Sequence, residues 1–367
     1  MKVKQPTLVL NAARCEQNIA AMVSKAEKLG LKLRPHFKTH QSAEVGKWFQ
    51  NRGVEAITVS SIDMAAYFIE AGWQDINIAF PVNILRLDHL RALSQKAEIT
   101  VLIDNMASAQ FLDEQLDFSL HAFIEIDTGG NRSGVHHEQK EETLKLTEFI
   151  KHAERINLRG FYTHAGHTYN ARSKGDIFKI ADQSLAYFDS IRKHLDNEGE
   201  YEFCWGDTPS CSTMDDFKSI NAISPGNFVF YDVMQYAIGA CTLDQIAVAM
   251  YCPVVSKHVV NTEICIHGGA IHFSKDFINL NDQKVFGLLA SKDSWKPIED
   301  CYVRALSQEH GMIKVSREVY DQISVGDTLT ILPVHSCLTA EAMGEYKTLS
   351  SEVITHFAQK NRDKARF

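Results

Sequence analysis

The feature that most restricts the fold of this chain is an eightfold alternation of short β-rich runs with amphipathic stretches. Runs such as AITVSS (56–61), ITVLID (99–104) and LHAFIEID (120–127) contain the β-branched and aromatic residues that favour strands. An intervening segment, SIDMAAYFIEAG (61–72), begins with serine and stops at glycine, as helices do. Eight such units predict an α/β fold, the (β/α)8 TIM barrel, and an open doubly wound sheet is the alternative that periodicity alone leaves open. The other five runs are LKLRPHFK (31–38), INIAF (76–80), LRGFYTHAG (158–166), YEFCWGDT (201–208) and ISPGNFVFYD (223–232).

The pattern changes after Gly239, where short β-rich runs follow one another with turn residues between them and little helical periodicity. Examples are TEICIHGG (262–269) and DTLTILPV (327–334). We therefore predict a barrel domain over residues 12–240 and a C-terminal all-β domain over residues 241–367. The early run TLVLN (7–11) is expected to pair with the β domain, which assigns residues 1–11 to it.

Composition agrees with two domains and excludes several classes of partner. A chain of 367 residues exceeds the size at which a single core usually stops growing. The 38 basic and 46 acidic residues give a net charge of −8, which argues against a nucleic-acid or anionic-membrane partner. The N-terminus has only a short apolar stretch and makes a poor secretion signal, no apolar run approaches a membrane span, and no CxxC pair occurs among the eight cysteines. We expect a cytoplasmic protein with reduced thiols.

Polar residues fall where the predicted strands end, and this is the edge at which barrels carry their chemistry. Lys38 ends the first run, and such a lysine is most often a surface group with its amine in water. At a barrel mouth beside Arg34, His36 and His40, burial and neighbouring positive charge would instead lower the pKa of the amine. A neutral lysine amine can form a Schiff base with a carbonyl group.

Two later segments suggest a phosphate site. GDTPSCST (206–213) offers a glycine, hydroxyl side chains and a helix start, and SPGN (224–227) offers a second glycine. Each segment alone is more often a plain turn. In barrels of this kind the loops after the last two strands commonly hold a phosphate. A Schiff-base lysine opposite a phosphate site indicates pyridoxal 5′-phosphate (PLP).

Several motifs, taken in order, resemble one family. RPHFKTH (34–40), IEIDTGGNRSGV (124–135), FYTHAGHTY (161–169) and PVHSCLTAE (333–341) are similar to segments of the D-serine dehydratase and D-threonine aldolase family, within the alanine racemase-like, fold-type III PLP enzymes. The resemblance implies that Lys38 holds PLP, that Arg132 approaches its phenolate oxygen, that His164 stacks on its ring and that Tyr162 lies near the ring nitrogen. It also implies a homodimer. The residues that it assigns to the phosphate are Gly206, Asp207, Thr208, Gly226 and Asn227.

The resemblance further assigns a divalent metal to His335 and Cys337. Two residues apart in a strand, their side chains would point the same way, and imidazole with thiolate favours Zn²⁺. His310, in SQEHG (307–311), is included as a candidate catalytic residue because the corresponding family segment approaches the active site. HGG (267–269) departs from the acidic D-x-G of many relatives, so the substrate need not be shared.

These residues predict a PLP-dependent, metal-assisted lyase acting on a small-molecule D-3-hydroxy amino acid. The reaction is either a D-serine dehydratase-like elimination or a D-threonine aldolase-like retro-aldol cleavage, and the H-x-C form of the metal motif favours dehydration. An amino-acid racemase is an alternative, weakened because we find no tyrosine segment to supply a second base. A non-catalytic PLP-binding protein is a further alternative, which the long C-terminal β-rich region argues against.

Overall fold

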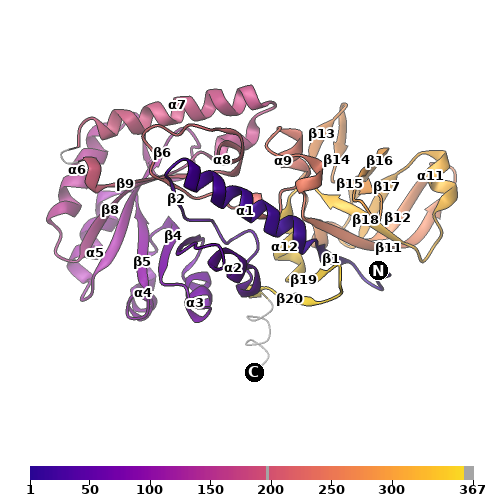
Figure 1. The fold of residues 1–367 in the computed structure, drawn as a ribbon, viewed down its shortest axis with the longest axis horizontal. Coiled ribbons are helices and arrows are strands. Elements are labelled where there is room, and N and C mark those ends of the chain that lie inside the picture. The colour runs from indigo at the N-terminus through magenta and orange to yellow at the C-terminus, as the bar shows by residue number, and fades with distance from the viewer. Residues whose placement is uncertain (196–197, 359–367) are drawn as a thin grey trace. The chain divides into compact units, whose positions relative to one another are not determined.

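The computed structural model describes residues 1–195 and 198–358, and its internal contacts divide the chain into two compact units (Figure 1). The barrel unit contains Ala21–Lys38 and Gly46–Gly226. The β unit contains Met1–Ala20, Thr39–Val45 and the described residues from Asn227 onward. By contacts, therefore, residues 12–20, 39–45 and 227–240, which we assigned to the barrel domain, group with the β unit.

The barrel unit is built on eight parallel strands in the order β2–β10–β9–β8–β6–β5–β4–β3. The two ends of this order meet where His36, just after β2, forms a parallel bridge with Thr58 of β3. Phe37 N–H donates to Thr58 O at 2.8 Å, and Thr58 N–H donates to Pro35 O at 3.0 Å. The predicted (β/α)8 barrel is confirmed. The strands are β2 (Lys32–Leu33), β3 (Ala56–Val59), β4 (Asp75–Pro81), β5 (Glu98–Ile103), β6 (Leu120–Asp127), β8 (Ile156–His164), β9 (Glu202–Gly206) and β10 (Ala222–Ile223), and a short β7 (Val135–His136) pairs with β6.

The first and last barrel strands are much shorter than their predicted runs. Proline explains both cases, because Pro35 and Pro225 lack the N–H that a regular strand donates. The chain beyond each short strand still approaches its neighbour, since His36 N–H donates to Pro225 O at 2.8 Å. The segment that carries Lys38 is thus irregular backbone attached to the barrel rim.

Helices lie around the parallel strands in the barrel unit (Figure 1). Side-chain caps set their first residues: Ser61 accepts from Met64 N–H at the start of α3, and Asn105 accepts from Ser108 N–H at the start of α5. The helix predicted from SIDMAAYFIEAG therefore begins where its serine indicated. The helices from the N-terminus to the end of this unit are α1 (Ala12–Lys28), α2 (Ala43–Gln50), α3 (Ile62–Glu70), α4 (Leu87–Ser94), α5 (Met106–Gln115), α6 (Lys140–His152), α7 (Lys174–Arg192) and α8 (Thr208–Thr213).

The interior of the barrel has an apolar and a charged part. Phe123 and Tyr162 belong to a buried apolar cluster with residues of neighbouring strands. Arg34 is fully buried; it binds Glu202 at 2.6 Å and Asp75 at 2.7 Å, carboxylates that begin β9 and β4. This charged part therefore lies at the N-terminal ends of the strands, away from the rim that carries chemistry.

The β unit contains an antiparallel sheet whose six strands β11, β12, β17, β16, β15 and β18 close on themselves, because β11 pairs with both β12 and β18. β1 extends this sheet, pairing antiparallel with β11 and parallel with β19, so the N-terminal run joins the β unit as the sequence predicted. The strands are β1 (Thr7–Leu10), β11 (Val248–His258), β12 (Glu263–His267), β13 (Ile278–Leu280), β14 (Gln283–Val285), β15 (Gly287–Ala290), β16 (Pro297–Leu306), β17 (His310–Lys314), β18 (Thr328–Pro333), β19 (Glu345–Thr348) and β20 (Val353–Thr355). The helices are α9 (Val233–Ala237), α10 (Ala270–Phe273), α11 (Arg317–Gln322) and α12 (Ser336–Met343).

Within the described residues, no helix has both the length and the apolar character that crossing a bilayer requires.

Candidate active site

The predicted cofactor-binding residues of the barrel unit gather at the C-terminal ends of its strands. His164 is the last residue of β8 and Gly206 the last residue of β9, while Arg132 follows β6 and half-buried Lys38 follows β2. Parallel strands present these ends at one rim, so residues far apart in sequence meet there.

His164 is held at this rim by a hydrogen bond to the backbone. Its Nδ1–H donates to Gly206 O at 2.6 Å, which leaves Nε2 as the ring atom without the proton. Burial, followed by the positive charges of Lys38 and Arg132, lowers the pKa of His164 to about 3. The imidazole is therefore a neutral aromatic face with two cations close to it. Gly166 leaves room for this ring, since a Cβ there would lie 3.1 Å from His164 Cδ2.

The expected surroundings of Lys38 need correction. We predicted that Arg34 and His40 would place positive charge beside the amine, and this is wrong for both. The guanidinium of Arg34 is neutralised by its two carboxylate partners at the opposite end of the strands. Burial and then the neighbouring His356 lower the pKa of His40 to about 3, so its ring is uncharged.

Tyr162 lies in the barrel interior with its hydroxyl close to Gly206. A Cβ on Gly206 would lie 2.6 Å from Tyr162 Oη, so only glycine allows the hydroxyl to occupy this place. Burial raises the pKa of Tyr162 far above its ordinary value. The hydroxyl therefore stays protonated and can donate a hydrogen bond to a group in the barrel mouth.

Asp207, Thr208 and Gly226 form the remainder of the predicted phosphate site in the barrel unit. Thr208 Oγ1 accepts from Gly226 N–H at 3.3 Å, so the two predicted segments do meet. The Asp207 carboxylate is turned inward, where it accepts from Ser210 N–H and Trp205 Nε1–H, each at 2.6 Å. Burial raises the pKa of Asp207 to about 6. Asp207 therefore caps α8 and shapes the turn, and its carboxylate is not a ligand for a phosphate.

Glu125 is a buried residue of this rim that the sequence reasoning missed. Its Oε1 accepts from Ser133 Oγ at 3.0 Å and lies 4.0 Å from Arg132 Nη2. Burial, opposed by these two groups, raises its pKa to about 7. The signal was present in LHAFIEID, because Glu125 shares the inward face of β6 with Phe123, where a carboxylate is unexpected.

The predicted metal pair lies in the β unit, but not in a strand. β18 ends at Pro333, and His335 immediately precedes α12, whose first turn contains Cys337. Burial alone would lower the pKa of His335, but its contacts with Asp276 and Cys337 raise it to about 11. Burial raises the pKa of the Cys337 thiol, but the hydrogen bond and the charge of His335, together with the hydrogen bond of Thr39, lower it below its ordinary value. The two side chains meet as predicted, by way of a helix start rather than a shared strand face.

Two further donors surround the sulfur of Cys337. Thr39 Oγ1, from the residue that follows Lys38 in the sequence, lies 3.2 Å from Cys337 Sγ. Asn227, which we assigned to the phosphate, donates its amide to Asp232 at 2.7 Å and to Cys337 Sγ at 3.5 Å. The side chain of Asn227 therefore belongs to the surroundings of the metal pair.

His310 begins β17 and is exposed, opposite His267 in the strand register. Nearby, His267 Nε2 and His272 Nε2 lie 3.4 and 3.9 Å from Glu309 Oε2, and these three side chains could in principle hold a metal ion. However, Gly269 N–H donates to His272 Nδ1 at 3.1 Å. The neutral ring must then carry its proton on Nε2, so that atom has no lone pair to offer. The catalytic role of His310 stays a prediction.

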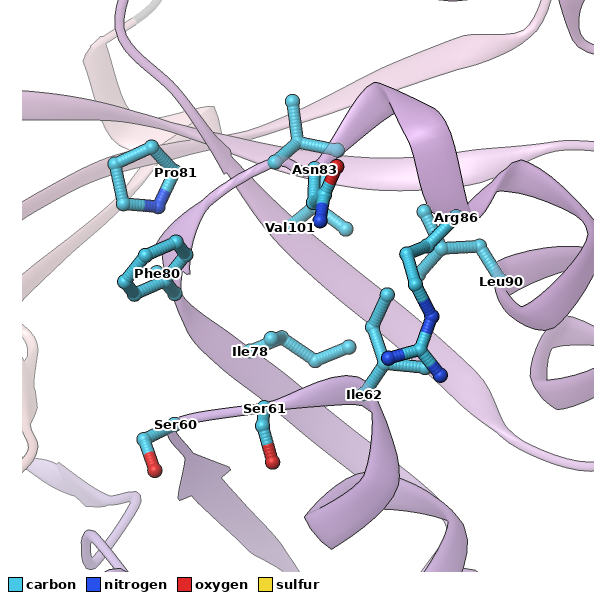
Figure 2. Close-up of a pocket in the computed structure, with 11 residues that line it drawn as sticks. Ser60, Ser61, Ile62, Ile78, Phe80, Pro81, Asn83, Arg86, Leu90 and Val101 are labelled. Atoms are coloured by element: carbon cyan, nitrogen blue, oxygen red, sulfur yellow. The ribbon is translucent and has the colours of Figure 1, made fainter.

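A separate apolar pocket of about 290 Å³ opens where β3 and β4 end, beside α3 and α4 (Figure 2). Figure 2 shows Phe80 on one side of it and Arg86 on the other. The Arg86 guanidinium is bound to Asp63, and none of the predicted site residues lines this pocket. Its lining is mainly apolar, with Ser60, Ser61, Asn83 and Arg86 as the polar residues.

Two family models together match most of the sequence of this chain. The family model "Alanine racemase, N-terminal domain" matches residues 10–232, and "Putative serine dehydratase domain" matches residues 247–349. The chain belongs to the alanine racemase N-terminal domain family. The resemblance stated from the motifs is confirmed, and PLP is the cofactor that this family implies.

Three curated relatives of the chain are named as enzymes of D-amino acids. D-serine dehydratase of Dictyostelium discoideum is 27% identical over 94% of this chain and 93% of its own length. D-threo-3-hydroxyaspartate dehydratase of Delftia sp. is 26% identical over 95% of this chain and 94% of its own length. D-threonine aldolase of Arthrobacter sp. is 27% identical over 54% of this chain and 53% of its own length.

Solved structures confirm the fold. The Delftia dehydratase has a TM-score of 0.89 at 23% identity, covering 96% of this chain and 97% of its own. A cysteine-to-alanine variant of that enzyme, solved in its metal-free form, has a TM-score of 0.90 at 23% identity, with the same coverage of both chains. Alanine racemase of Clostridium difficile is more distant, with a TM-score of 0.66 at 16% identity, covering 97% of this chain and all of its own.

Proposed function

We propose that this protein is a PLP-dependent, metal-assisted lyase that removes water from a D-3-hydroxy amino acid. The observation that carries the proposal is the grouping of Lys38, Arg132 and a neutral His164 at the rim of a barrel whose family implies PLP. Relatives that match nearly the whole chain are dehydratases of D-serine and D-threo-3-hydroxyaspartate, which supports this substrate class.

The residues present suit PLP. Lys38 supplies the amine that would hold it, the uncharged ring of His164 supplies a flat face, and Arg132 supplies a cation for an anionic oxygen. Gly206 leaves the space that a Cβ would fill. When bound, PLP withdraws electrons from the substrate Cα, which makes the Cα proton acidic.

The protein's own groups then carry the proton. Lys38, which would hold the cofactor in the absence of substrate, would act as the general base that takes the Cα proton once substrate is bound. Tyr162 keeps its hydroxyl proton and acts as a neutral hydrogen-bond donor, so it moderates the electron demand of the cofactor. The 3-hydroxyl would leave as water together with the proton that Lys38 has taken, and the resulting enamine would add one water to give a 2-keto acid and ammonia.

His335 and Cys337 would hold the metal, and we assign Zn²⁺ from the imidazole and thiolate donors. Two protein ligands leave coordination positions open for substrate oxygen and water. Bound there, the ion would act as a Lewis acid that lowers the pKa of the substrate hydroxyl and improves it as a leaving group. The metal-free cysteine variant of the Delftia dehydratase supports a metal site in this fold.

The proposal is tested by a product assay on the purified protein loaded with PLP. D-serine, D-threo-3-hydroxyaspartate and D-threonine are supplied with and without added zinc, and 2-keto acid, glycine and the L-enantiomer are measured. We expect 2-keto acid and ammonia, lost on chelation and restored by zinc. Glycine with an aldehyde would indicate retro-aldol cleavage, and the L-enantiomer would indicate a racemase.

Lys38→Ala is the matched variant for the cofactor. It should remove the visible absorbance that a lysine-bound PLP gives, together with activity, because no other amine is proposed to hold the cofactor. An unchanged spectrum would contradict the role of Lys38. A homodimer is part of the same proposal, on the strength of the resemblance, and light scattering of the purified protein tests it.

A further inference from the structure

Asp276 and His335 are joined by a contact that the reaction described above does not use. Asp276 Oδ2 lies 2.5 Å from His335 Nδ1, although the two residues are 59 positions apart in the chain. A carboxylate accepts, so His335 donates its Nδ1 proton. The proton that remains when a cation binds the ring is thereby placed on Nδ1, and the nitrogen offered to the cation is Nε2.

We propose that Asp276 is a positioning residue for the metal: it fixes the tautomer and the ring orientation of His335, so that Nε2 is presented to the cation beside Cys337. This inference rests on the proposed function, since it requires that His335 and Cys337 bind a metal. A carboxylate on the distal nitrogen of a histidine ligand also makes the ring a better electron donor, and loss of such a partner typically weakens metal binding about 10–100-fold.

The segment that carries Asp276 is held against the helix that carries the metal pair. Thr339 Oγ1, in α12, donates to Phe273 O at 3.2 Å and also lies 2.9 Å from His335 O. Ser274 has a positive φ of 74°, which is uncommon for a residue with a side chain. Its hydroxyl accepts from Asp276 N–H at 3.2 Å. The turn thus directs the Asp276 carboxylate towards His335 through several independent contacts.

The nearby His272 has a different partner at Nδ1, and its tautomer differs accordingly. His272 lies on α10, four residues before Asp276, and its Nδ1 accepts an N–H from Gly269. That contact puts the proton on Nε2, the opposite tautomer from the one assigned to His335. The partner of Nδ1 therefore distinguishes the histidine that can ligate a metal through Nε2 from the one that cannot.

The other nearby carboxylate is already engaged. Asp232 Oδ2 accepts from Ser336 N–H at 2.9 Å and from the Asn227 amide at 2.7 Å, and its Oδ1 accepts from Gln235 N–H at 2.9 Å. These donors hold Asp232 as the cap of α9. Asp276, whose Oδ2 contacts His335 Nδ1, is therefore the carboxylate that orients His335.

The test is zinc affinity, measured on the PLP-loaded, full-length protein by competition with a chromophoric chelator. We expect affinity to fall in the order wild type, Asp276→Asn, Asp276→Ala, with the alanine variant about 10–100-fold weaker than wild type. The amide keeps one acceptor oxygen but loses the charge, so it should be intermediate. Asp282→Asn, an exposed acid-to-amide change in the β13–β14 turn, is the matched control and should bind zinc as wild type does.

A second readout separates ligand geometry from folding. With cobalt in place of zinc, the visible spectrum reports the ligand set and its symmetry, and Asp276→Ala should change that spectrum while circular dichroism remains native. If Asp276→Ala does not fold, Asp276→Asn carries the same comparison. Zinc affinities within twofold of wild type for the Asp276 variants would overturn the positioning role and leave the proposed function intact. Failure of the wild-type protein to bind zinc, or undiminished binding by Cys337→Ala, would overturn both.

Discussion

Replacing Glu125 by glutamine should stabilise the cofactor-free protein in mild alkali much more than in mild acid. Burial raises the pKa of this carboxyl from 4.5 to about 7. Between these values the folded protein keeps a proton that the unfolded chain releases, so the stability associated with Glu125 is greatest in acid and falls as the pH rises through 7. Above that pH, the difference between 4.5 and 7 corresponds to about 3 kcal/mol of destabilisation.

Glutamine has the same shape and cannot ionise, so it should remove this cost. Urea denaturation would show a gain for Glu125→Gln about 2–3 kcal/mol larger at about pH 8.5 than at about pH 5. Glu138→Gln is the control, because its carboxylate lies just after β7 and is 79% exposed. An equal gain at both pH values, or none at the higher one, would refute the assignment of Glu125 as a strained buried carboxyl.

Three other variants and measurements test the barrel. Gly206→Ala should destabilise the protein by about 1–3 kcal/mol, since its Cβ would lie 2.6 Å from Tyr162 Oη, and thermal denaturation of the double variant with Tyr162→Phe should show part of that loss recovered. Arg34→Met should lower the free energy of unfolding in urea titrations by about 3–5 kcal/mol, because two carboxylates lose a buried partner. A decrease of less than about 1 kcal/mol would contradict this. His164, whose pKa burial and two nearby cations lower to about 3, should remain neutral from about pH 5 to 9 in nitrogen NMR spectra; titration near neutrality would contradict its burial.

Much of the barrel was predictable because its signals are local. Strand runs, serine caps and glycine stops each depend on a few neighbouring residues, and their repetition identified the (β/α)8 barrel before any contact was known. The lengths of β2 and β10 were not predicted correctly, although Pro35 and Pro225 in those runs indicated a break.

Some residues of the candidate site were predicted from the sequence and others were not. Lys38, Arg132 and His164 were identified from motifs, and the rim of a parallel barrel brings them together. His335 and Cys337 were identified for a reason that was wrong, because a helix start rather than a strand pairs them. Glu125 was missed although its place on the apolar face of a strand signalled a buried carboxylate, and Asp276 was missed because its partner His335 is 59 positions away.

By itself, the sequence determined which residue types stand at the ends of which strands, and that was enough for the architecture, the family resemblance and the choice of PLP. Only the tertiary structure decided protonation and orientation. The protonation states of Glu125 and His164 depend on burial and on the groups that the fold brings next to them, and the tautomer of His335 depends on a carboxylate 59 positions earlier in the chain. Desolvation and hydrogen bonding are properties of the packed molecule, so no local pattern in the chain encodes them.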